Sequence, residues 1–323
     1  MMTKVDLITG FLGAGKTTFL LRYAAFLKQQ GQRIGILVFD HGALNIDMTI
    51  LGELRAENCE LEMLTCTWDA DCRRRRLRTK LIAMGMNGYD RVIIEPSGVF
   101  DMDEFFDVLQ DPPLDRWYEP GSVIAVVSAV PEPEATPEED YYLASQAANA
   151  GCILMSRVQI ATEGEKEQSL AHLERALKMI RCLPPEEERI LAKNWNDLEE
   201  GDFRRLMNCG CRVADYVKSI AGRADGFQSL PFLGLSLSGE ELKEKTEILF
   251  HNRKYGQILR VKGFYSENGN WIELNATASG ICTAPAREKR ASLLVIGREL
   301  KEEEIHILLT GRRPVLHMLD AQL

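Results

Sequence analysis

Long apolar runs are missing from this sequence. No run approaches the roughly 20 apolar residues that a transmembrane helix needs, and the short apolar stretch near the N-terminus passes straight into a glycine-rich segment. We therefore expect no membrane span, no signal peptide and a cytoplasmic location. An excess of positive charge is also missing. The formal net charge is −9 at pH 7, which argues against nucleic-acid binding through bulk charge.

The remaining composition is that of a globular protein. The 323 residues suggest about two domains, and 45% hydrophobic with 27% charged residues is an ordinary balance. In a cytoplasmic protein the eight cysteines are expected to be thiols or metal ligands rather than disulfides.

Residues 10–17, GFLGAGKT, fit the phosphate-binding pattern G-x-x-x-x-G-K-[ST]. An apolar run at 4–9 reads as a buried strand before it, and helical spacing at 18–30 follows it. Glycines let backbone N–H groups turn inward on a phosphate, and the helix N-terminus adds its dipole. Lys16 supplies positive charge to the β- and γ-phosphates, and the Thr17 hydroxyl can ligate Mg²⁺. The alternative is a strand-to-helix turn without a ligand.

The predicted nucleotide-binding residues of this loop are Gly10, Gly13, Ala14, Gly15, Lys16, Thr17 and Thr18.

A second segment suits the phosphate side of the site. Glu95-Pro96-Ser97-Gly98 ends the apolar run 91–95, where an acidic residue can serve Mg²⁺ or an attacking water. The backbone N–H of Gly98 can approach the γ-phosphate. Asp40 and Asp47, which follow the apolar run 32–39, can reach the same Mg²⁺. The alternatives are an ordinary proline–glycine turn and two solvated loop acids.

Strand-like and helical patterns alternate through the first two thirds of the chain. Further apolar runs lie at 60–64, 122–127 and 152–155, and helical stretches lie at 102–109, 139–150 and 163–181. This order predicts an α/β domain, residues 1–225, with a mostly parallel sheet covered by helices on both faces.

The pattern changes after a linker at 222–227. Strands are predicted at 232–237, 257–265, 270–276 and 292–296, and helices at 240–250 and 302–309. An Asn268-Gly269 turn marks a hairpin, and Ser238 with Glu241 marks a capping box. Residues 231–323 are therefore predicted to form a small α+β domain with one antiparallel sheet.

Several of these segments together resemble the CobW/HypB/UreG group of P-loop GTPases and metallochaperones. They are ITGFLGAGKTTFLL, VFDHGALNID, IIEPSG, ASQAANAGCILMSR, ILRVKGF and SLLVIGREL. The resemblance covers most of the chain, and implies a P-loop nucleotide-binding domain followed by a CobW C-terminal-type domain. It implies slow hydrolysis of GTP with Mg²⁺, which resets switch loops that dock a client.

The resemblance also assigns roles to residues and partners. Lys16 stabilises the developing charge, Asp40 or Glu95 positions water, and Mg²⁺ is held by Thr17 with Asp47 and Glu95. The client is implied to be a metalloenzyme or a cobalamin-dependent protein, with a role in metal delivery or cobalamin biosynthesis and a homodimer as a candidate assembly.

The base-recognition motif departs from the family pattern N-K-x-D. The matching segment is Ser156-Arg157-Val158-Gln159. Arg157 can lay its stem and guanidinium over a base, whereas Gln159 cannot copy a carboxylate that accepts two N–H bonds. Losing that contact costs on the order of 1.5–3 kcal/mol. The expected preference for GTP is therefore weakened, and ATP remains an alternative nucleotide.

The family's C-x-C-C metal motif is also incomplete. Cys66 occupies a family position, Trp68 and Asp69 replace the other two cysteines, and Cys72 is off register. A soft Zn²⁺ or Co²⁺ site can still be drawn from Cys66 and Cys72 with Cys59 and His41. The alternative is that these are incidental thiols.

Other features have a structural and a functional interpretation. The run 73–80, RRRRLRTK, is either a solvated helix face or a dock for an acidic partner or anion. Cys209 and Cys211 are either a two-thiol clip or incidental. His251, His306 and His317 are expected to be structural.

Two other functions stay open at this point. The degenerate motifs are also compatible with a nucleotide-gated adaptor that does not hydrolyse. A P-loop kinase is disfavoured because no lid segment is evident and the chain carries the C-terminal domain of the family.

Overall fold

The computed structural model describes residues 2–40, 46–65, 70–131, 135–212, 214, 216, 227–286 and 290–313. These residues fall into two compact units, one within residues 1–225 and one within residues 226–323. None of the described helices combines the length and the apolar character needed to cross a membrane.

The first unit is built on a seven-stranded sheet in the order β3-β2-β4-β1-β5-β6-β7. All neighbouring strands pair in parallel. The strands are β1 (Thr3–Thr9), β2 (Ile34–Asp40), β3 (Cys59–Thr65), β4 (Arg91–Glu95), β5 (Tyr118–Ser128), β6 (Cys152–Ser156) and β7 (Ile190–Leu191). The predicted α/β fold is confirmed, and the carboxyl ends of these strands face one edge of the sheet.

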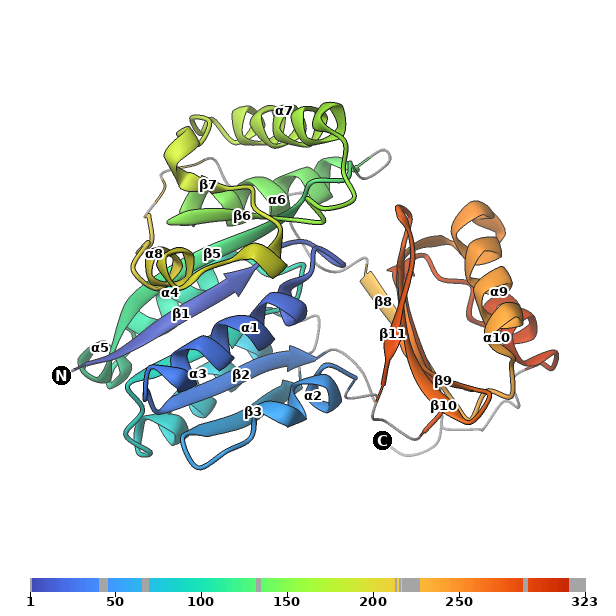
Figure 1. The fold of residues 1–323 in the computed structure, drawn as a ribbon, viewed down its shortest axis with the longest axis horizontal. Coiled ribbons are helices and arrows are strands. Elements are labelled where there is room, and N and C mark those ends of the chain that lie inside the picture. The colour runs from blue at the N-terminus through green and yellow to red at the C-terminus, as the bar shows by residue number, and fades with distance from the viewer. Residues whose placement is uncertain are drawn as a thin grey trace. The chain divides into compact units, whose positions relative to one another are not determined.

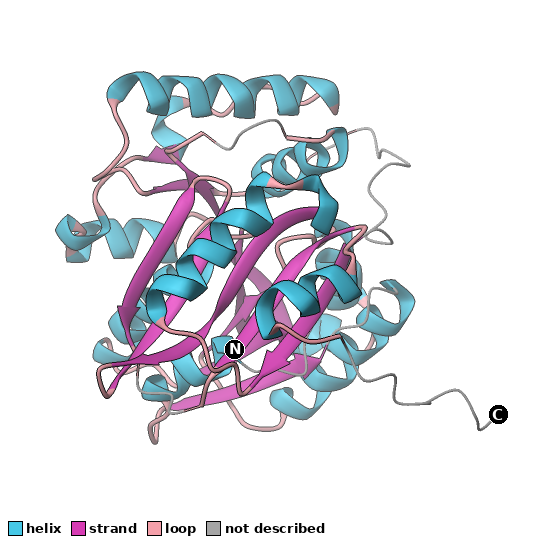
Figure 2. Cartoon of the chain, turned by 90° about the vertical axis from the view of Figure 1, so that its right-hand side faces the viewer, coloured by secondary structure: helices cyan, strands magenta, loops and turns pink. Residues whose placement is uncertain are grey.

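Helices cover both faces of this sheet, as Figures 1 and 2 show. One face packs on α1 (Lys16–Gln29), α2 (Ile46–Leu51) and α8 (Glu200–Met207). The other packs on α3 (Ala70–Gly85), α4 (Met102–Gln110) and α6 (Pro137–Asn149), and α7 (Glu163–Met179) lies on α6. Because both faces are covered, every residue of β4 and β6 is buried.

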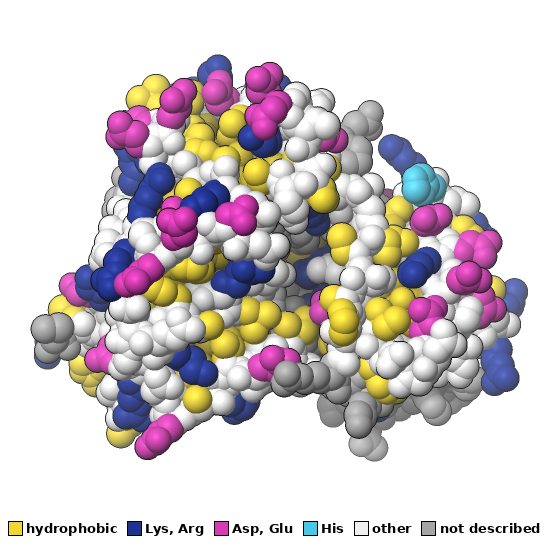
Figure 3. Space-filling model, in the orientation of Figure 1, with side chains coloured by type: hydrophobic (Ala, Val, Ile, Leu, Met, Phe, Trp, Pro, Cys, Tyr) yellow, Lys and Arg dark blue, Asp and Glu magenta, His cyan; other side chains and the backbone are white. Residues whose placement is uncertain are grey.

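Short helical segments complete the unit: η1 (Gly52–Leu54), α5 (Leu114–Trp117), η2 (Glu187–Arg189) and η3 (Trp195–Asp197). Figure 3 shows acidic side chains along the outer side of α7 and apolar atoms beneath it.

The second unit is a five-stranded antiparallel sheet in the order β11-β10-β9-β12-β8. Its elements are β8 (Phe227–Leu233), α9 (Gly239–His251), η5 (Arg253–Tyr255), β9 (Gln257–Glu267), β10 (Asn270–Thr277), β11 (Gly280–Pro285), β12 (Ser292–Arg298) and α10 (Glu302–Thr310). Leu249 and Ile305 of the two helices pack with Val261 and Leu274 in one core. The predicted antiparallel α+β unit is confirmed.

Two local predictions in this unit are confirmed as well. Asn268 and Gly269 have φ of 51° and 80° between β9 and β10, as the predicted turn requires. The Ser238 hydroxyl accepts the N–H of Glu241 at 3.2 Å, and the Glu241 carboxylate accepts the N–H of Ser238 at 2.9 Å.

The first strand of this unit was placed wrongly by the sequence. β8 runs over Phe227–Leu233, whereas residues 232–237 were predicted and Phe227 was assigned to the linker. Phe227 is buried, with the Arg298 guanidinium 4.2 Å from its ring centre. That cross-strand contact cannot be seen in local sequence. β11 was missed because it is a largely exposed edge strand without apolar alternation.

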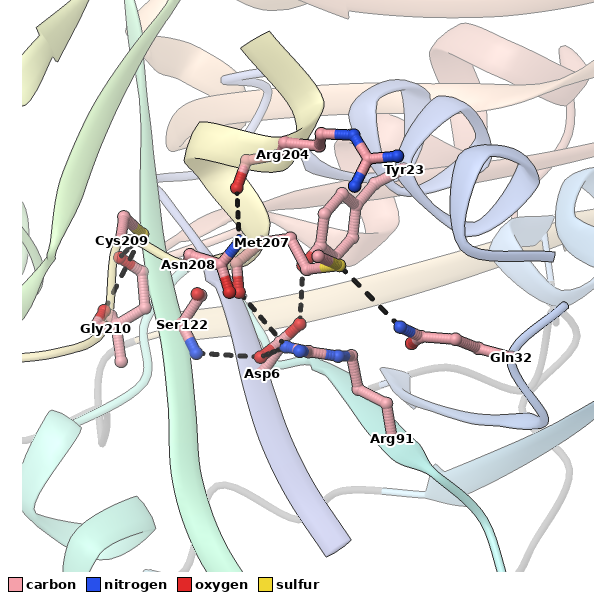
Figure 4. A network of polar contacts seen from close by, with 11 residues as sticks. Asp6, Tyr23, Gln32, Arg91, Ser122, Arg204, Met207, Asn208, Cys209 and Gly210 are labelled. Atoms are coloured by element: carbon pink, nitrogen blue, oxygen red, sulfur yellow. Dashed lines mark hydrogen bonds and ion pairs between the residues drawn. The ribbon is translucent and has the colours of Figure 1, made fainter. Parts of the chain in front are cut away.

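A buried polar network crosses the centre of the first sheet (Figure 4). Asp6 of β1 is fully buried and accepts hydrogen bonds from Arg91 at 2.5 Å, Tyr23 at 2.6 Å and the Ser122 N–H at 2.7 Å. Burial raises the pKa of Asp6, and Arg91 opposes that rise. A Cβ on Gly121 would overlap the Asp6 carboxylate. One carboxylate thus connects β1, β4, β5 and α1.

We expect Asp6→Ala to lower the free energy of unfolding by about 3–5 kcal/mol, because it leaves the Arg91 charge buried without its partner. Equilibrium urea unfolding measures the loss. The double variant Asp6→Ala/Arg91→Met is expected to recover much of it, since no buried charge then remains. A loss below about 1 kcal/mol, the size of a surface ion pair, would contradict the assigned role.

Candidate functional site

The loop between β1 and α1 has a backbone that only glycine adopts readily. Gly10, Gly13 and Gly15 have φ of 148°, 77° and 106°, and Gly15 is the residue that precedes α1. A Cβ on Gly10 would also overlap the Val126 carbonyl of β5. The glycines of the motif are therefore required by the shape of the loop, which turns the chain directly into the N-terminus of α1.

Lys16 lies inside this loop. Its side chain is buried, and Nζ donates to the carbonyl oxygens of Gly10 at 2.9 Å and Phe11 at 3.3 Å. Thr18, one turn into the helix, is exposed. The positive charge of Lys16 is thus held at the centre of the loop, where the helix dipole also favours an anion.

Thr17 and Glu95 are brought together as predicted. The Thr17 hydroxyl donates to Oε1 of Glu95 at 2.8 Å, and both residues are buried. Glu95 ends β4, which pairs with β1, so the first turn of α1 and the end of β4 meet at the same sheet edge. Hydroxyl and carboxylate oxygens are the hard ligands that Mg²⁺ prefers. The pair therefore fits a magnesium ion.

Gly98 packs directly against the glycine loop. A Cβ there would lie 2.5 Å from the Leu12 nitrogen. The Gln146 side chain of α6 donates to the Gly98 carbonyl at 3.1 Å and is itself buried. The loop that begins at Glu95 is thus held between the phosphate loop and α6. No local sequence pattern indicates the Gln146 contact.

Arg157 connects the predicted base-binding segment to the phosphate loop. It follows β6 with φ of 58°, and its guanidinium donates to the Gly13 carbonyl at 2.9 Å and the Ser128 hydroxyl at 3.3 Å. The predicted contact between this guanidinium and a base stays a prediction. Ser156 is buried at the end of β6, and Gln159 is exposed in the turn that follows.

Trp195 is a site residue that sequence reasoning missed. It follows the short strand β7, and its indole N–H donates to the Met155 carbonyl at 2.9 Å. A Cβ on Gly15 would lie 3.1 Å from the Trp195 ring, and the ring packs 5.6 Å from Phe19. Arg22 of α1 donates to the Trp195 carbonyl at 2.9 Å. No local pattern in the sequence indicates this contact.

Several predicted ligands lie outside what the structure describes. The backbone of Asp40 ends β2 two residues beyond Val38, which pairs with Glu95, so it reaches the same sheet edge. The side chains of Asp40 and Asp47 are outside the described residues, and so are Cys66 and His41 altogether. Their roles stay predictions.

The proposed soft-metal set is corrected in one respect. Cys59 starts β3, whereas Cys72 lies in the first turn of α3, beyond the other end of that strand. The seven residues of β3 span about 20 Å, so Cys59 cannot share a site with Cys72. Across the described residues, no three His, Cys, Asp or Glu side chains form a metal-binding group.

The other cysteine and histidine candidates have local roles. Burial raises the pKa of Cys209 to about 12 and also raises that of Cys211, which disfavours the thiolates that a metal clip needs. His251 contacts the Glu247 carbonyl and His306 the Arg312 carbonyl. His317 lies outside the described residues.

The basic run lies on α3, and several of its side chains contact groups of the first unit. Arg73 is buried and makes a two-point ion pair with Glu104 of α4. Lys80 pairs with Glu62 of β3 at 2.6 Å. Arg74, Arg76 and Arg78 also contact groups of the same unit, namely Asp107, Asp111, Thr65 and Pro112. These contacts favour a structural role for the run over a partner-binding one.

Thiol labelling tests the assignment of Cys209. At pH 8 we expect the exposed Cys282 to react quickly with 5,5′-dithiobis(2-nitrobenzoate), and Cys209 to react slowly because a pKa of about 12 leaves few thiolates. Cys282→Ser should remove a fast-reacting thiol, and Cys209→Ser should leave the fast phase unchanged. Fast labelling of Cys209 at pH 8 would refute its burial as a protonated thiol.

Comparison with known proteins places the chain among nucleotide-binding proteins. A sequence model of the CobW/HypB/UreG nucleotide-binding domain matches residues 4–184. The zinc chaperone YjiA of Escherichia coli K12 is 31% identical over 170 residues, 50% of this chain and 51% of that protein. The zinc chaperone YeiR of the same organism is 31% identical over 127 residues, 39% of this chain and 38% of that protein. The chain thus spans about half of the length of YjiA and 38% of the length of YeiR.

Two solved structures are similar at lower identity. Zn(II)-bound YjiA GTPase from E. coli has 20% identity and a TM-score of 0.39, and the match covers 97% of this chain and 100% of that one. HypB from Helicobacter pylori in complex with nickel has 14% identity and a TM-score of 0.39, with 62% of this chain and 82% of that one covered.

Proposed function

Because the chain belongs to the CobW/HypB/UreG family, we propose that it binds a nucleoside triphosphate with Mg²⁺ and hydrolyses it slowly. Hydrolysis resets the loops around residues 40–50 and 95–101, which dock a client protein. The observation that carries the proposal is the meeting of Lys16, Thr17 and Glu95 at one sheet edge, on a glycine loop that enters a helix.

The phosphate end is held by the loop and α1. Backbone N–H groups of Gly13 to Thr18 and the dipole of α1 favour a polyphosphate at this position. On binding, the Lys16 amine exchanges its contacts with the Gly10 and Phe11 carbonyls for oxygens of the β- and γ-phosphates. There it stabilises charge that develops in phosphoryl transfer.

Thr17 and Glu95 would hold Mg²⁺, with Asp47 as a further proposed ligand. The ion, when bound, neutralises charge on the β- and γ-phosphate oxygens. Glu95 or Asp40 orients the attacking water, and the Gly98 N–H approaches the γ-phosphate. Gln146 assists by holding the backbone of Gly98 through its carbonyl oxygen.

Slow turnover follows from where the nearby arginines are engaged. Arg157 donates to the Gly13 carbonyl and Arg22 to the Trp195 carbonyl. Both side chains are thus engaged by protein carbonyls, and we propose neither of them as the arginine that contacts the transferred phosphoryl group. Phosphoryl transfer without an arginine finger is slow by factors of about 10³–10⁵. A client that supplied such a residue would accelerate it.

We propose metal delivery as the purpose of the switch, with Zn²⁺ or Co²⁺ as cargo and a metalloenzyme or cobalamin-dependent protein as client. Support comes from two relatives that are named zinc chaperones. Cys66 and Cys72 are the proposed soft ligands. The chain is proposed to act in the cytoplasm, as a homodimer or with the client.

A non-hydrolysing adaptor is the second candidate. Gln159 in place of an acid and the loss of two family cysteines favour it. Single-turnover assays with GTP and ATP separate the two, since an adaptor binds nucleotide and releases no phosphate.

We expect Lys16→Ala to abolish hydrolysis and to weaken triphosphate binding strongly, because the variant removes a buried positive charge from the proposed phosphate site. Phosphate release and calorimetric titration with Mg²⁺ and GTP or ATP measure both effects. Lys4→Ala is a matched control, since Lys4 is an exposed lysine on the same β1–α1 unit. Wild-type turnover in Lys16→Ala would show that the site is wrongly assigned.

The predicted role of Gln159 in recognising the nucleotide base is tested by placing an acid at this position. Gln159→Asp should raise the preference for GTP over ATP by about tenfold or more, the equivalent of about 1.5–3 kcal/mol for an ion-assisted contact. The ratio of the two dissociation constants is the readout, and Gln168→Asp on exposed α7 is the control. An unchanged ratio would place the base away from Gln159.

A further inference from the structure

The first unit contains a cavity of about 450 Å³ that nucleotide binding does not use. It is lined by the ends of α6 and α7, by residues 181–186 and 189, and by Arg212 and Ala214. The lining residues of α6 precede the amino end of β6, and those from Leu177 to Arg189 precede the amino end of β7, whereas the phosphate loop follows the carboxyl end of β1. No residue of the phosphate loop lines the cavity.

Three arginines and one acid line this cavity. They are Arg181, Arg189, Arg212 and Glu186. Within the described part of the chain, no salt bridge satisfies any of the three arginines. This contrasts with the arginines of α3, several of which pair with acids of the same unit. The charge of Glu186 acts favourably on Arg189, but one acid against three arginines leaves the lining of the cavity with a net positive charge.

Arg189 is the fixed member of the set. Its guanidinium donates to the carbonyl oxygens of Ala147, at 3.4 Å, and Ala150, and so caps the last turn of α6. Its Nε is buried and has no hydrogen-bond partner among the described residues. Burial and the neighbouring charge of Arg212 lower the pKa of Arg189. An anion in the cavity would relieve the repulsion between the two guanidinium groups.

The capping role does not account for the other two arginines. Arg181 and Arg212 are exposed, and no described hydrogen bond ties either side chain to the end of α6. Arg181 is held with φ of 63°, just past the end of α7. Two cations beyond the one that caps the helix make the cavity wall more positive than the structure of α6 requires.

The rest of the wall is apolar. Leu177 of α7, Ala147 and Ala148 of α6, and the pair Pro184-Pro185 contribute it. Leu183, which also lines the cavity, is 88% exposed. An inorganic ion would leave this apolar wall unused, whereas an organic anion would cover it. A volume of about 450 Å³ is within the range of small-molecule sites.

We propose that this cavity binds a small organic anion. Its carboxylate or phosphate head contacts Arg189 and Arg212, with Arg181 at the rim, and its apolar part lies on the wall formed by α6, α7 and the two prolines. The site is separate from nucleotide hydrolysis and does not depend on the function proposed above.

The test uses the full chain and the fluorescent anion 1-anilinonaphthalene-8-sulfonate, which has an anionic head on an apolar body. We expect one saturable site per chain in the folded protein. The double variant Arg181→Gln/Arg212→Gln should weaken it by about tenfold or more, because two charge-assisted contacts are lost. Both side chains are exposed, so folding should be retained, and circular dichroism checks this. Arg175→Gln, at an exposed arginine of α7, should bind like the wild type.

Competition and a second variant separate the possible outcomes. Displacement of the probe by inorganic phosphate identifies a phosphate head, and displacement by acetate identifies a carboxylate head. Lys16→Ala should retain the site, because the phosphate loop does not line the cavity. The proposal is overturned if no saturable binding occurs at millimolar probe, or if the double variant binds like Arg175→Gln. It is also overturned if Lys16→Ala alone removes the binding.

Discussion

The hydrogen bond from Thr17 to Glu95 depends on the order of strands in the parallel sheet. β4 lies next to β1, so the residue that ends β4 meets the first turn of the helix that follows β1. No separate loop has to be folded inward to supply the carboxylate. Gly98 packs on Leu12 and leaves no room for a Cβ. This packing keeps the loop after Glu95 against the glycine loop. The strand order of the sheet, more than the choice of side-chain rotamers, therefore places Glu95 beside Thr17.

Asp6 joins the three central strands β1, β4 and β5 through hydrogen bonds of its side chain. Its carboxylate accepts hydrogen bonds from β4, β5 and α1, so a shift of any one of these elements would break a hydrogen bond to a buried carboxylate. This network fixes the register on which the Thr17–Glu95 contact depends. α6 contacts both the nucleotide site and the cavity proposed to bind an organic anion. Gln146 donates to the Gly98 carbonyl, and the next residue, Ala147, lines that cavity.

Much of the phosphate side could be predicted because its signals are local. A glycine pattern between a strand and a helix, and an acid at the end of a neighbouring apolar run, are both visible in the sequence. Trp195 and Gln146 could not be predicted, because each acts through a backbone carbonyl that is distant in sequence. Arg157 was expected near a base, and its bond to Gly13 depends on a loop geometry that no local pattern encodes. β8 and β11 were misplaced or missed because cross-strand pairing, and not alternation, defines them.

The central claim is that the glycine loop grips a polyphosphate. Calorimetric titration of the purified protein with GTP and with ATP, both with Mg²⁺, tests it most directly. We expect one nucleotide to bind per chain for at least one of the two, with binding weakened when the γ-phosphate is absent. If neither nucleotide binds at millimolar concentration, the loop is not a phosphate site, and the function built on it is wrong.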